Sequence, residues 1–308
     1  MDKPTIAFLG IGLMGNPMAL RLLQAGFSVH IWNRTAAKAR LLGSAGARVH
    51  EEVRDAVDSA DIVISMLEDG SAVQATIAAA LPALQPGTLW VDMSSIRQDE
   101  ALTCHAILSG AEMRHLDAPV SGGVTGAENG TLAIMAGGDP GDFIRANAVF
   151  QALGTAVLVG PAGSGQVAKL CNQLIVGATL HIVAEALLLA QAAGADPAAV
   201  RDAIRGGFAG SKILEVHGQR MLERNFIPGG QVKSQLKDQR NVLAAAADAG
   251  LALPVTAIVT AQYQSLADDL AHADHAAALI ALERINSGLR LGDAPDRFTA
   301  AASSFPPT

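Results

Sequence analysis

The sequence predicts an α/β fold, with an N-terminal Rossmann-type, doubly wound parallel sheet followed by an all-α C-terminal domain. Two observations support this prediction. Apolar strand-like runs alternate with helical stretches through the first half of the chain, as in a parallel sheet with crossover helices. After the Gly- and Pro-rich segment 160–163, apolar residues recur only at helical spacing. We therefore expect a sheet domain over residues 1–162, a helical domain over 163–290 and a flexible tail over 291–308.

The first four expected strands are apolar runs, and three further strands and the helices are expected between turn residues. The expected strands are 5–9, 28–32, 61–66, 88–92, 114–117, 132–136 and 155–159. Helices are expected between them at 14–25, 35–45, 71–80, 97–109 and 140–152. The second domain is expected to begin with a long interdomain helix, so that its helices are 166–193, 197–206, 211–224, 232–249, 254–270 and 274–287.

Gly10, Gly12 and Gly15 form a G-x-G-x-x-G motif between the first expected strand and the first helix. Such a motif in this place is typical of a dinucleotide-binding site, although a glycine-rich turn without a ligand is the alternative. Gly10 permits a tight turn, Gly12 lets a pyrophosphate approach the backbone, and Gly15 lets the helix pack against the strand. The free N–H groups of the helix N-terminus would face the phosphates. We also expect cofactor contacts from Leu13, Met14, Met66 and Leu67.

Asn33, Arg34 and Thr35 follow the second expected strand, where an NAD site usually has an acidic residue ~20 residues past the glycines. Asn33 would not repel a 2′-phosphate, and Arg34 can bind one through two N–H groups. Thr35 adds a hydroxyl at the start of the next helix. The alternative is an ordinary turn with an N-cap. We therefore expect NADP as the cofactor in preference to NAD.

Composition excludes several classes of function. The net charge is −7 and the pI is about 5.6, so a nucleic-acid partner is not expected. The apolar stretch 174–195 contains His181 and Glu185 and is interpreted as a buried helix, not a membrane span. The chain begins with a strand instead of a signal peptide, and we expect a cytoplasmic protein. Cys104 and Cys171 match neither metal-ligand nor disulfide spacing, so we expect two buried thiols and no metal.

Two further segments have the composition of a reaction site. In 117–123 a proline and two glycines follow a strand, so that Ser121 and successive backbone amides could bind a carboxylate; an ordinary strand-to-loop transition is the alternative. In 163–172, Lys169 and Asn172 are three residues apart on one helix face, among apolar neighbours. Lys169 is either a proton donor and acceptor in a cleft at the domain junction or a lysine whose ammonium reaches water.

Four stretches together identify a family resemblance: 10–18, 117–123, 163–172 and Lys237–Asp238. In this order they resemble the β-hydroxyacid dehydrogenases, which include 3-hydroxyisobutyrate dehydrogenase, tartronate semialdehyde reductase and the glyoxylate and succinic semialdehyde reductases. The resemblance covers the chain from its first strand to about residue 240.

The resemblance implies a role for each matching residue. Lys169 would be catalytic, and Asn172 would assist it and contact the substrate. Ser121, Gly122 and Gly123 would hold the substrate carboxylate, with Ser95 near the nicotinamide. Lys237 would contact the cofactor, and Asp238 would lie beside the substrate.

These implications predict an NADP-dependent oxidoreductase that reduces a small carboxylate-bearing aldehyde or oxidises the corresponding hydroxy acid. A lysine titrates ordinarily near ~10.4, so at neutral pH Lys169 can donate the proton that accompanies the hydride. The expected substrates are glyoxylate and the succinic, tartronate and methylmalonate semialdehydes. The alternatives are an imine reductase, which usually has Asp or Tyr where this chain has Lys169, and a non-catalytic dinucleotide-binding module. The helical domain is expected to bind substrate and to form a homodimer or homotetramer.

Overall fold

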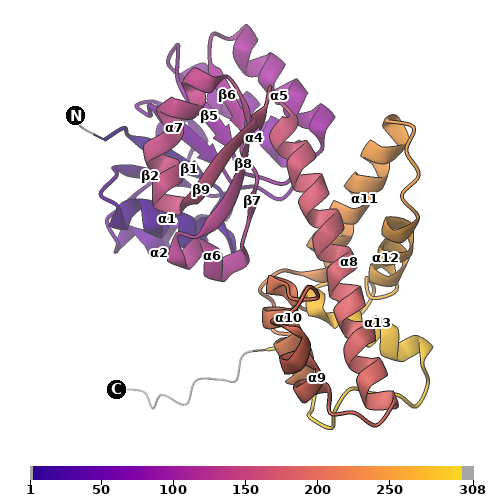
Figure 1. The fold of residues 1–308 in the computed structure, drawn as a ribbon. Coiled ribbons are helices and arrows are strands. Elements are labelled where there is room, and N and C mark those ends of the chain that lie inside the picture. Colours follow the sequence, from indigo (N-terminus) through magenta and orange to yellow (C-terminus); the bar gives the residue numbers. More distant parts are fainter. Residues whose placement is uncertain (1–2, 300–308) are drawn as a thin grey trace, which may run out of the picture. The chain divides into compact units, whose positions relative to one another are not determined.

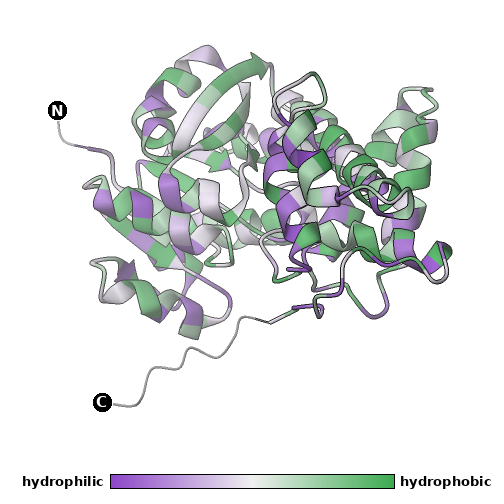
Figure 2. Cartoon of the chain, turned by 60° about the horizontal axis from the view of Figure 1, so that its bottom comes forward, coloured by the Kyte–Doolittle hydropathy of each residue, from purple (hydrophilic) through white to green (hydrophobic). Residues whose placement is uncertain are grey.

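The computed structural model describes residues 3–299 and forms two compact units, which divide after Lys169 (Figure 1). The first unit contains a sheet with helices on both faces, and the second unit is helical. This confirms the predicted fold class. Figure 2 shows that hydrophobic and hydrophilic residues alternate along the helices, which is the pattern of helices that bury one face.

The sheet of the N-terminal unit has the strand order β3-β2-β1-β4-β5-β6-β8-β7, with β9 paired to β8. Its strands are β1 (Ile6–Leu9), β2 (Val29–Trp32), β3 (Arg48–Val49), β4 (Ile62–Ser65), β5 (Leu89–Asp92), β6 (Arg114–Asp117), β7 (Val120–Ser121), β8 (Leu132–Gly138) and β9 (Gly154–Gly160). The helices of this unit are α1 (Gly15–Gln24), α2 (Ala36–Gly43), α3 (Val53–Val57), α4 (Gly70–Ala80), η1 (Leu81–Ala83), α5 (Gln98–Gly110), α6 (Gly123–Asn129) and α7 (Pro140–Leu153).

The sheet is mostly parallel, as predicted, with two antiparallel strand pairs. β8 runs antiparallel to both β6 and β7. The connection between β6 and β8 contains the short elements β7 and α6. The sequence also did not predict β3, β7, α3 and α6, because runs of two to seven residues carry little periodicity.

Two hydrophobic cores cover the two faces of the sheet. Alternate residues of one strand enter different cores: Ile6 and Phe8 pack with α1, α2, α6 and α7, whereas Ala7 and Leu9 pack with α3, α4 and α5. Burial on both faces explains why the central strands are continuous apolar runs. The strand order reverses between β1 and β4, and in open α/β sheets ligands bind at the carboxyl ends of the strands flanking such a point.

The C-terminal unit contains most of α8 (Ser164–Ala192) and a third hydrophobic core. Its other helices are α9 (Pro197–Ile204), α10 (Lys212–Leu222), α11 (Val232–Asp248), α12 (Pro254–Gln264), η2 (His275–Ala277) and α13 (Ala278–Ile285). Among the described residues, α8 is the helix long and apolar enough to cross a membrane, and half of its apolar window is buried inside the structure. Leu180, Ala184 and Leu187 of α8 belong to the core, which accounts for part of this apolar composition.

The cysteine prediction is right for one residue and wrong for the other. Cys104 is buried in α5, where burial raises the pKa of its thiol to about 12. Cys171 is exposed, because it lies on the same outward stripe of α8 as Val167 and Ile175, each four residues away. In a helix that is apolar on most positions, the sequence does not show which stripe faces outward.

The residues before 300 in the expected tail contact the C-terminal unit. Leu291 is buried, and Arg297 exchanges backbone hydrogen bonds with residues 224 and 226. The guanidinium of Arg224 binds Asp296 and forms a two-point ion pair with Glu283, at 2.7 and 2.9 Å. Residues 300–308 of the expected tail lie outside the described residues.

Candidate active site

The glycine motif forms a tight loop between β1 and α1. Gly10 has φ +106°, and a Cβ there would lie 2.3 Å from the Met66 carbonyl oxygen. A Cβ at Gly15 would lie 1.9 Å from the Gly10 carbonyl oxygen, so α1 can start here only without a side chain. At Gly12, by contrast, a Cβ would meet nothing within 4 Å. Protein packing therefore explains Gly10 and Gly15, whereas at Gly12 a side chain would occupy only open space, as expected where a ligand approaches the backbone.

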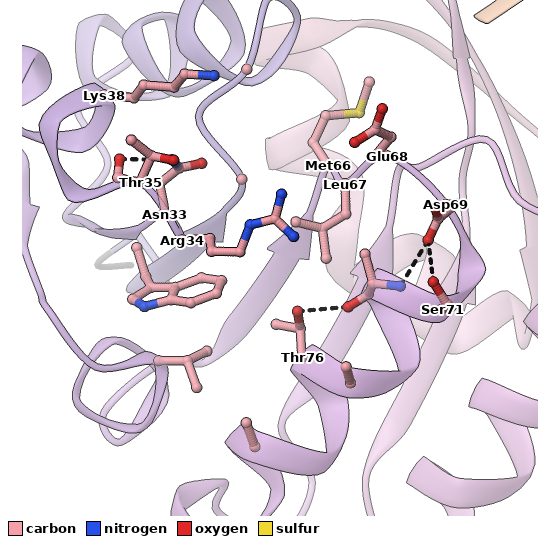
Figure 3. Close-up of a pocket in the computed structure, with 17 residues that line it drawn as sticks. Asn33, Arg34, Thr35, Lys38, Met66, Leu67, Glu68, Asp69, Ser71 and Thr76 are labelled. Carbon is pink, nitrogen blue, oxygen red and sulfur yellow. Dashed lines mark hydrogen bonds between the residues drawn. The ribbon is translucent and has the colours of Figure 1, made fainter.

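A pocket of about 610 Å³ opens beside this loop, within the usual size of a small-molecule site. It lies at the carboxyl ends of β1, β2 and β4, which is where the strand order reverses (Figure 3). Seven of the residues predicted to contact the cofactor line the pocket: Gly10, Gly12, Asn33, Arg34, Thr35, Met66 and Leu67. Gly12 and its open surroundings therefore fit a dinucleotide bound at this pocket.

Leu13 and Met14 are placed differently. The Leu13 side chain is exposed, and Met14 is the residue that precedes α1. Neither lines the pocket. Their predicted cofactor contacts stay predictions.

Asn33 connects the glycine loop to the end of β2. Its Oδ1 accepts a hydrogen bond from the Ile11 amide at 2.8 Å, and its Nδ2 donates to the Thr35 carbonyl oxygen at 2.9 Å. A carboxylate at this position could accept the first bond but could not donate the second. The amide therefore has a structural reason to be present, in addition to the absence of charge that the sequence suggested.

The pocket has cations on one wall and carboxylates on another. Figure 3 shows Arg34 reaching across it, with Thr35 and Lys38 on the side of α2. Glu68 and Asp69 come from the segment after β4 and lie on the other side. Lys38 was not singled out from the sequence, although its position one helical turn after Arg34 was the available signal.

The predicted substrate loop is shorter than expected. Ser121 ends β7, Gly122 follows with φ +139°, and α6 begins at Gly123. A loop with two uncovered glycines was expected here, and the correction is that Gly123 already belongs to a helix. The three residues predicted to bind a carboxylate thus lie at a strand-to-helix junction.

Lys169 lies beside this junction. Its Nζ donates a 2.8 Å hydrogen bond to the carbonyl oxygen of Val120, the residue before Ser121, and the lysine side chain is buried. Helix α8, which carries Lys169, is held at its start by Asp117: the two carboxylate oxygens accept from the amides of Gly163 and Gln166 at 2.7 and 2.9 Å. Burial raises the pKa of Asp117 to about 7, against the two backbone hydrogen bonds, which lower it.

Ser95, the other residue predicted near the nicotinamide, follows β5 in the same unit. Its neighbour Ser94 accepts from the Leu67 amide through its hydroxyl at 2.9 Å. The Ser95 segment is therefore tied to the segment after β4, which lines the cofactor pocket.

In the C-terminal unit, Asn172 and Asp238 are joined through Gln173. Asn172 Nδ2 donates to Gln173 Oε1 at 2.8 Å, and Gln173 Nε2 donates to Asp238 Oδ2 at 2.6 Å. The ammonium of Lys237 lies 3.6 Å from the other oxygen of Asp238. The sequence pointed to Asn172, Lys237 and Asp238 but not to Gln173, because a polar residue inside a helix gives no signal of its partners.

One group in residues 3–299 has the spacing of a metal site: His217, Asp274 and His275. Asp274, however, already accepts hydrogen bonds from the amides of Gly229, Gly230 and Ala276, and Arg220 lies 3.5 Å away. Groups of the protein thus already balance the negative charge of Asp274, and this residue is the N-cap of η2.

Two family models match the chain. Residues 5–160 match the NAD-binding domain of 6-phosphogluconate dehydrogenase, and residues 163–282 match the NAD-binding domain of NADP-dependent 3-hydroxyisobutyrate dehydrogenase. Among curated relatives, 2-hydroxy-3-oxopropionate reductase of Escherichia coli is 40% identical over 90% of this chain and 97% of its own length.

Solved structures agree with this match. Mycobacterium tuberculosis 3-hydroxyisobutyrate dehydrogenase has a TM-score of 0.83 at 33% identity and covers 91% of this chain and 99% of its own. An imine reductase from Myxococcus stipitatus has a TM-score of 0.62 at 19% identity over 91% and 100% of the two chains, and this likeness shows the fold alone.

The sequence matches, the dinucleotide-type loop and the two-unit architecture lead to one conclusion. The chain belongs to the 3-hydroxyisobutyrate dehydrogenase family of β-hydroxyacid dehydrogenases, as an NAD(P)-dependent oxidoreductase of the hydroxyacid dehydrogenase and reductase type.

Proposed function

We propose that this enzyme is an NADP-dependent reductase of small aldehydes that carry a carboxylate, with Lys169 as the proton donor. The observation that carries the proposal is the hydrogen bond from Lys169 Nζ to Val120, which places the ammonium next to the Ser121–Gly123 junction. A bound NADPH supplies the hydride. The protein must then orient the carbonyl group and provide a proton for its oxygen.

Lys169 suits the second task. An ammonium has three N–H donors, of which the Val120 carbonyl takes one. A hydrogen bond to the substrate oxygen stabilises the negative charge that develops there, and transfer of the proton completes the reduction. Asn172 lies three residues further along the same helix face and would orient the same oxygen or the lysine.

The substrate class follows from the residues beside Lys169. Ser121 can donate its hydroxyl, and Gly122 and Gly123 expose backbone amides at the start of α6, which together suit a carboxylate. The curated relative from E. coli is by name a 2-hydroxy-3-oxopropionate reductase, which supports tartronate semialdehyde as the first candidate. Glyoxylate and the succinic and methylmalonate semialdehydes follow it.

The test is a panel assay of NADPH oxidation with these four aldehydes and a cyclic imine. We expect turnover with at least one aldehyde, and Lys169→Met should reduce kcat by about 10²–10⁴-fold. Lys212→Met is the matched control, because the Lys212 side chain is 83% exposed and lies far along the chain in α10. Full activity of Lys169→Met, or turnover of the imine alone, would refute the proposal.

The preference for NADP rests on the cations of the pocket. Arg34 and Lys38 both line it, and Thr35, although it precedes α2, makes no N-cap hydrogen bond with its hydroxyl. A 2′-phosphate could bind all three side chains, whereas the ribose hydroxyl of NAD offers them no charge.

Arg34→Ala should raise the KM for NADPH about 10–100-fold, as expected for a lost hydrogen bond to a charged group, and leave the KM for NADH nearly unchanged. Arg40→Ala is the control, since Arg40 lies in α2, shortly after Arg34 in the chain, pairs with Glu51 at 3.8 Å and does not line the pocket. A wild-type enzyme that prefers NADH would overturn this part of the proposal.

We also infer that the enzyme is a homodimer or homotetramer. Ile175, Ile182 and Leu189 lie at seven-residue intervals on α8, and each is about 60–70% exposed. A row of exposed aliphatic side chains on one helix suits contact with a second copy. Light scattering of the wild type and of Ile182→Glu tests this, and a monomeric wild type would contradict it.

A further inference from the structure

Gln166 is a fully buried polar residue that the reaction described above does not use. Its side chain bridges two segments far apart in the sequence. Oε1 accepts a hydrogen bond from the Ile96 amide at 3.1 Å, and Nε2 donates to the Ser94 carbonyl oxygen at 2.9 Å. These two backbone groups stand on either side of Ser95, so the carboxamide holds the Ser95 segment at both ends.

The backbone of Gln166 is held just as firmly. Its amide donates to Asp117 Oδ2. The start of α8 can come this close to Asp117 only because two neighbouring residues are glycines. A Cβ at Gly165 would lie 2.4 Å from the Asp117 carbonyl oxygen, and one at Gly137 would lie 2.6 Å from Asp117 Oδ1. The start of α8 therefore cannot shift against the end of β6 without breaking buried hydrogen bonds.

Lys169 follows Gln166 by three residues, so both side chains leave the same face of α8. Gln166 reaches the segment that contains Ser95, and Lys169 reaches Val120 beside Ser121. One turn of helix thus connects the three segments that carry the predicted nicotinamide, carboxylate and proton-donor residues.

We propose that Gln166 is a positioning residue, which sets the Ser95 segment at a constant place relative to the Lys169 ammonium. The inference rests on the proposed function of Lys169. The carboxamide is suited to this role because it donates and accepts at once, as the Ser94 carbonyl and the Ile96 amide require. A misplacement of about 1 Å between reacting groups costs on the order of 10²-fold in rate.

Two variants separate positioning from simple packing. Gln166→Met keeps the length of the side chain but removes both hydrogen bonds. Gln166→Glu keeps the acceptor for Ile96 when ionised and regains the donor for Ser94 only when protonated. Gln151→Met is the matched control, because Gln151 is an exposed glutamine on α7 of the same unit.

The assay measures kcat and the KM for NADPH over a range of pH, with the best aldehyde of the panel. We expect Gln166→Met to lower kcat about 10–100-fold at all pH values, with the KM for NADPH within about threefold of wild type. Gln166→Glu should recover kcat, relative to Gln166→Met, as the pH falls. A structural role alone would not produce this difference between the pH profiles.

The result that overturns the proposal is a kcat of Gln166→Met within about twofold of wild type, or parallel pH profiles for the two variants. If Gln166→Met does not fold, the pH profile of Gln166→Glu against wild type decides the point. Failure of the proposed function is recognised separately: Lys169→Met would then be active. Inactive Lys169→Met with fully active Gln166→Met would refute only the positioning role.

Discussion

His115 makes the stability of the N-terminal unit depend on pH. The imidazole lies in β6 and is buried, and neither ring nitrogen has a hydrogen-bond partner in the described structure. Burial lowers the pKa of His115 from its ordinary 6.5 to about 3, and the nearby His105 acts in the same direction. Between these two pH values the unfolded chain binds a proton that the folded chain excludes. Acidification below pH 6.5 therefore favours unfolding.

The magnitude follows from the difference between pH and the ordinary pKa. At pH 5 the unfolded imidazole is about 1.5 pH units below its pKa, and each unit is worth 1.36 kcal/mol, so the loss is about 2 kcal/mol relative to neutral pH. Replacing His115 by Leu, which has a similar volume and no titrating group, should remove this loss. At pH 7 the change should be small, because no hydrogen bond is broken.

Tryptophan fluorescence during urea unfolding provides the assay. The chain has two tryptophans, Trp32 and Trp90, and both belong to strands of the N-terminal unit. The free energy of unfolding of His115→Leu relative to wild type should rise by about 2 kcal/mol from pH 7 to pH 5. The raised pKa of Asp117 has the opposite effect on stability, but it acts equally in both proteins and cancels in the comparison. His272→Asn, at an exposed histidine, is the control. A relative change below about 0.5 kcal/mol would refute the reasoning.

Two further predictions concern the glycine loop and the buried arginine. Gly12→Ala should fold with an unchanged unfolding midpoint but bind NADPH at least about tenfold more weakly. Gly15→Ala should lose about 1–3 kcal/mol of stability, because its Cβ would overlap the Gly10 carbonyl. Fluorescence titration and urea unfolding measure both, and equal effects of the two substitutions on stability would contradict the steric argument. Arg224→Met should destabilise the C-terminal unit by about 3 kcal/mol, since it leaves Glu283 and the partly exposed Asp296 without their cation. Calorimetry measures this, and a loss below about 1 kcal/mol would show that water replaces the guanidinium.

Most of the architecture could be predicted from local pattern. The strands β1, β2, β4 and β5 were located to within about one residue, because strands buried on both faces are largely apolar runs between turn residues. The strand β6 was also located, although only Leu116 among its four residues is apolar. The long helix α8 was also predicted, since a long apolar segment of this composition is compatible with few other structures. The direction of β8 and the short elements β7 and α6 were not predicted, because they depend on pairing between strands and leave no periodic signal.

The sequence by itself determined the dinucleotide loop, the two-part architecture and the motifs around Lys169. Each of these depends on the types and spacing of residues that are close together in the chain. Only the tertiary structure decided how these residues are held. Asn33 forms a hydrogen bond between the end of β2 and the glycine loop, and Asp117 accepts one from the start of α8. Gln166 accepts a hydrogen bond from the segment that contains Ser95, 70 residues away. Such contacts form between backbone groups and side chains that folding brings together. The sequence does not show which group will form a hydrogen bond with a given buried amide or carboxylate.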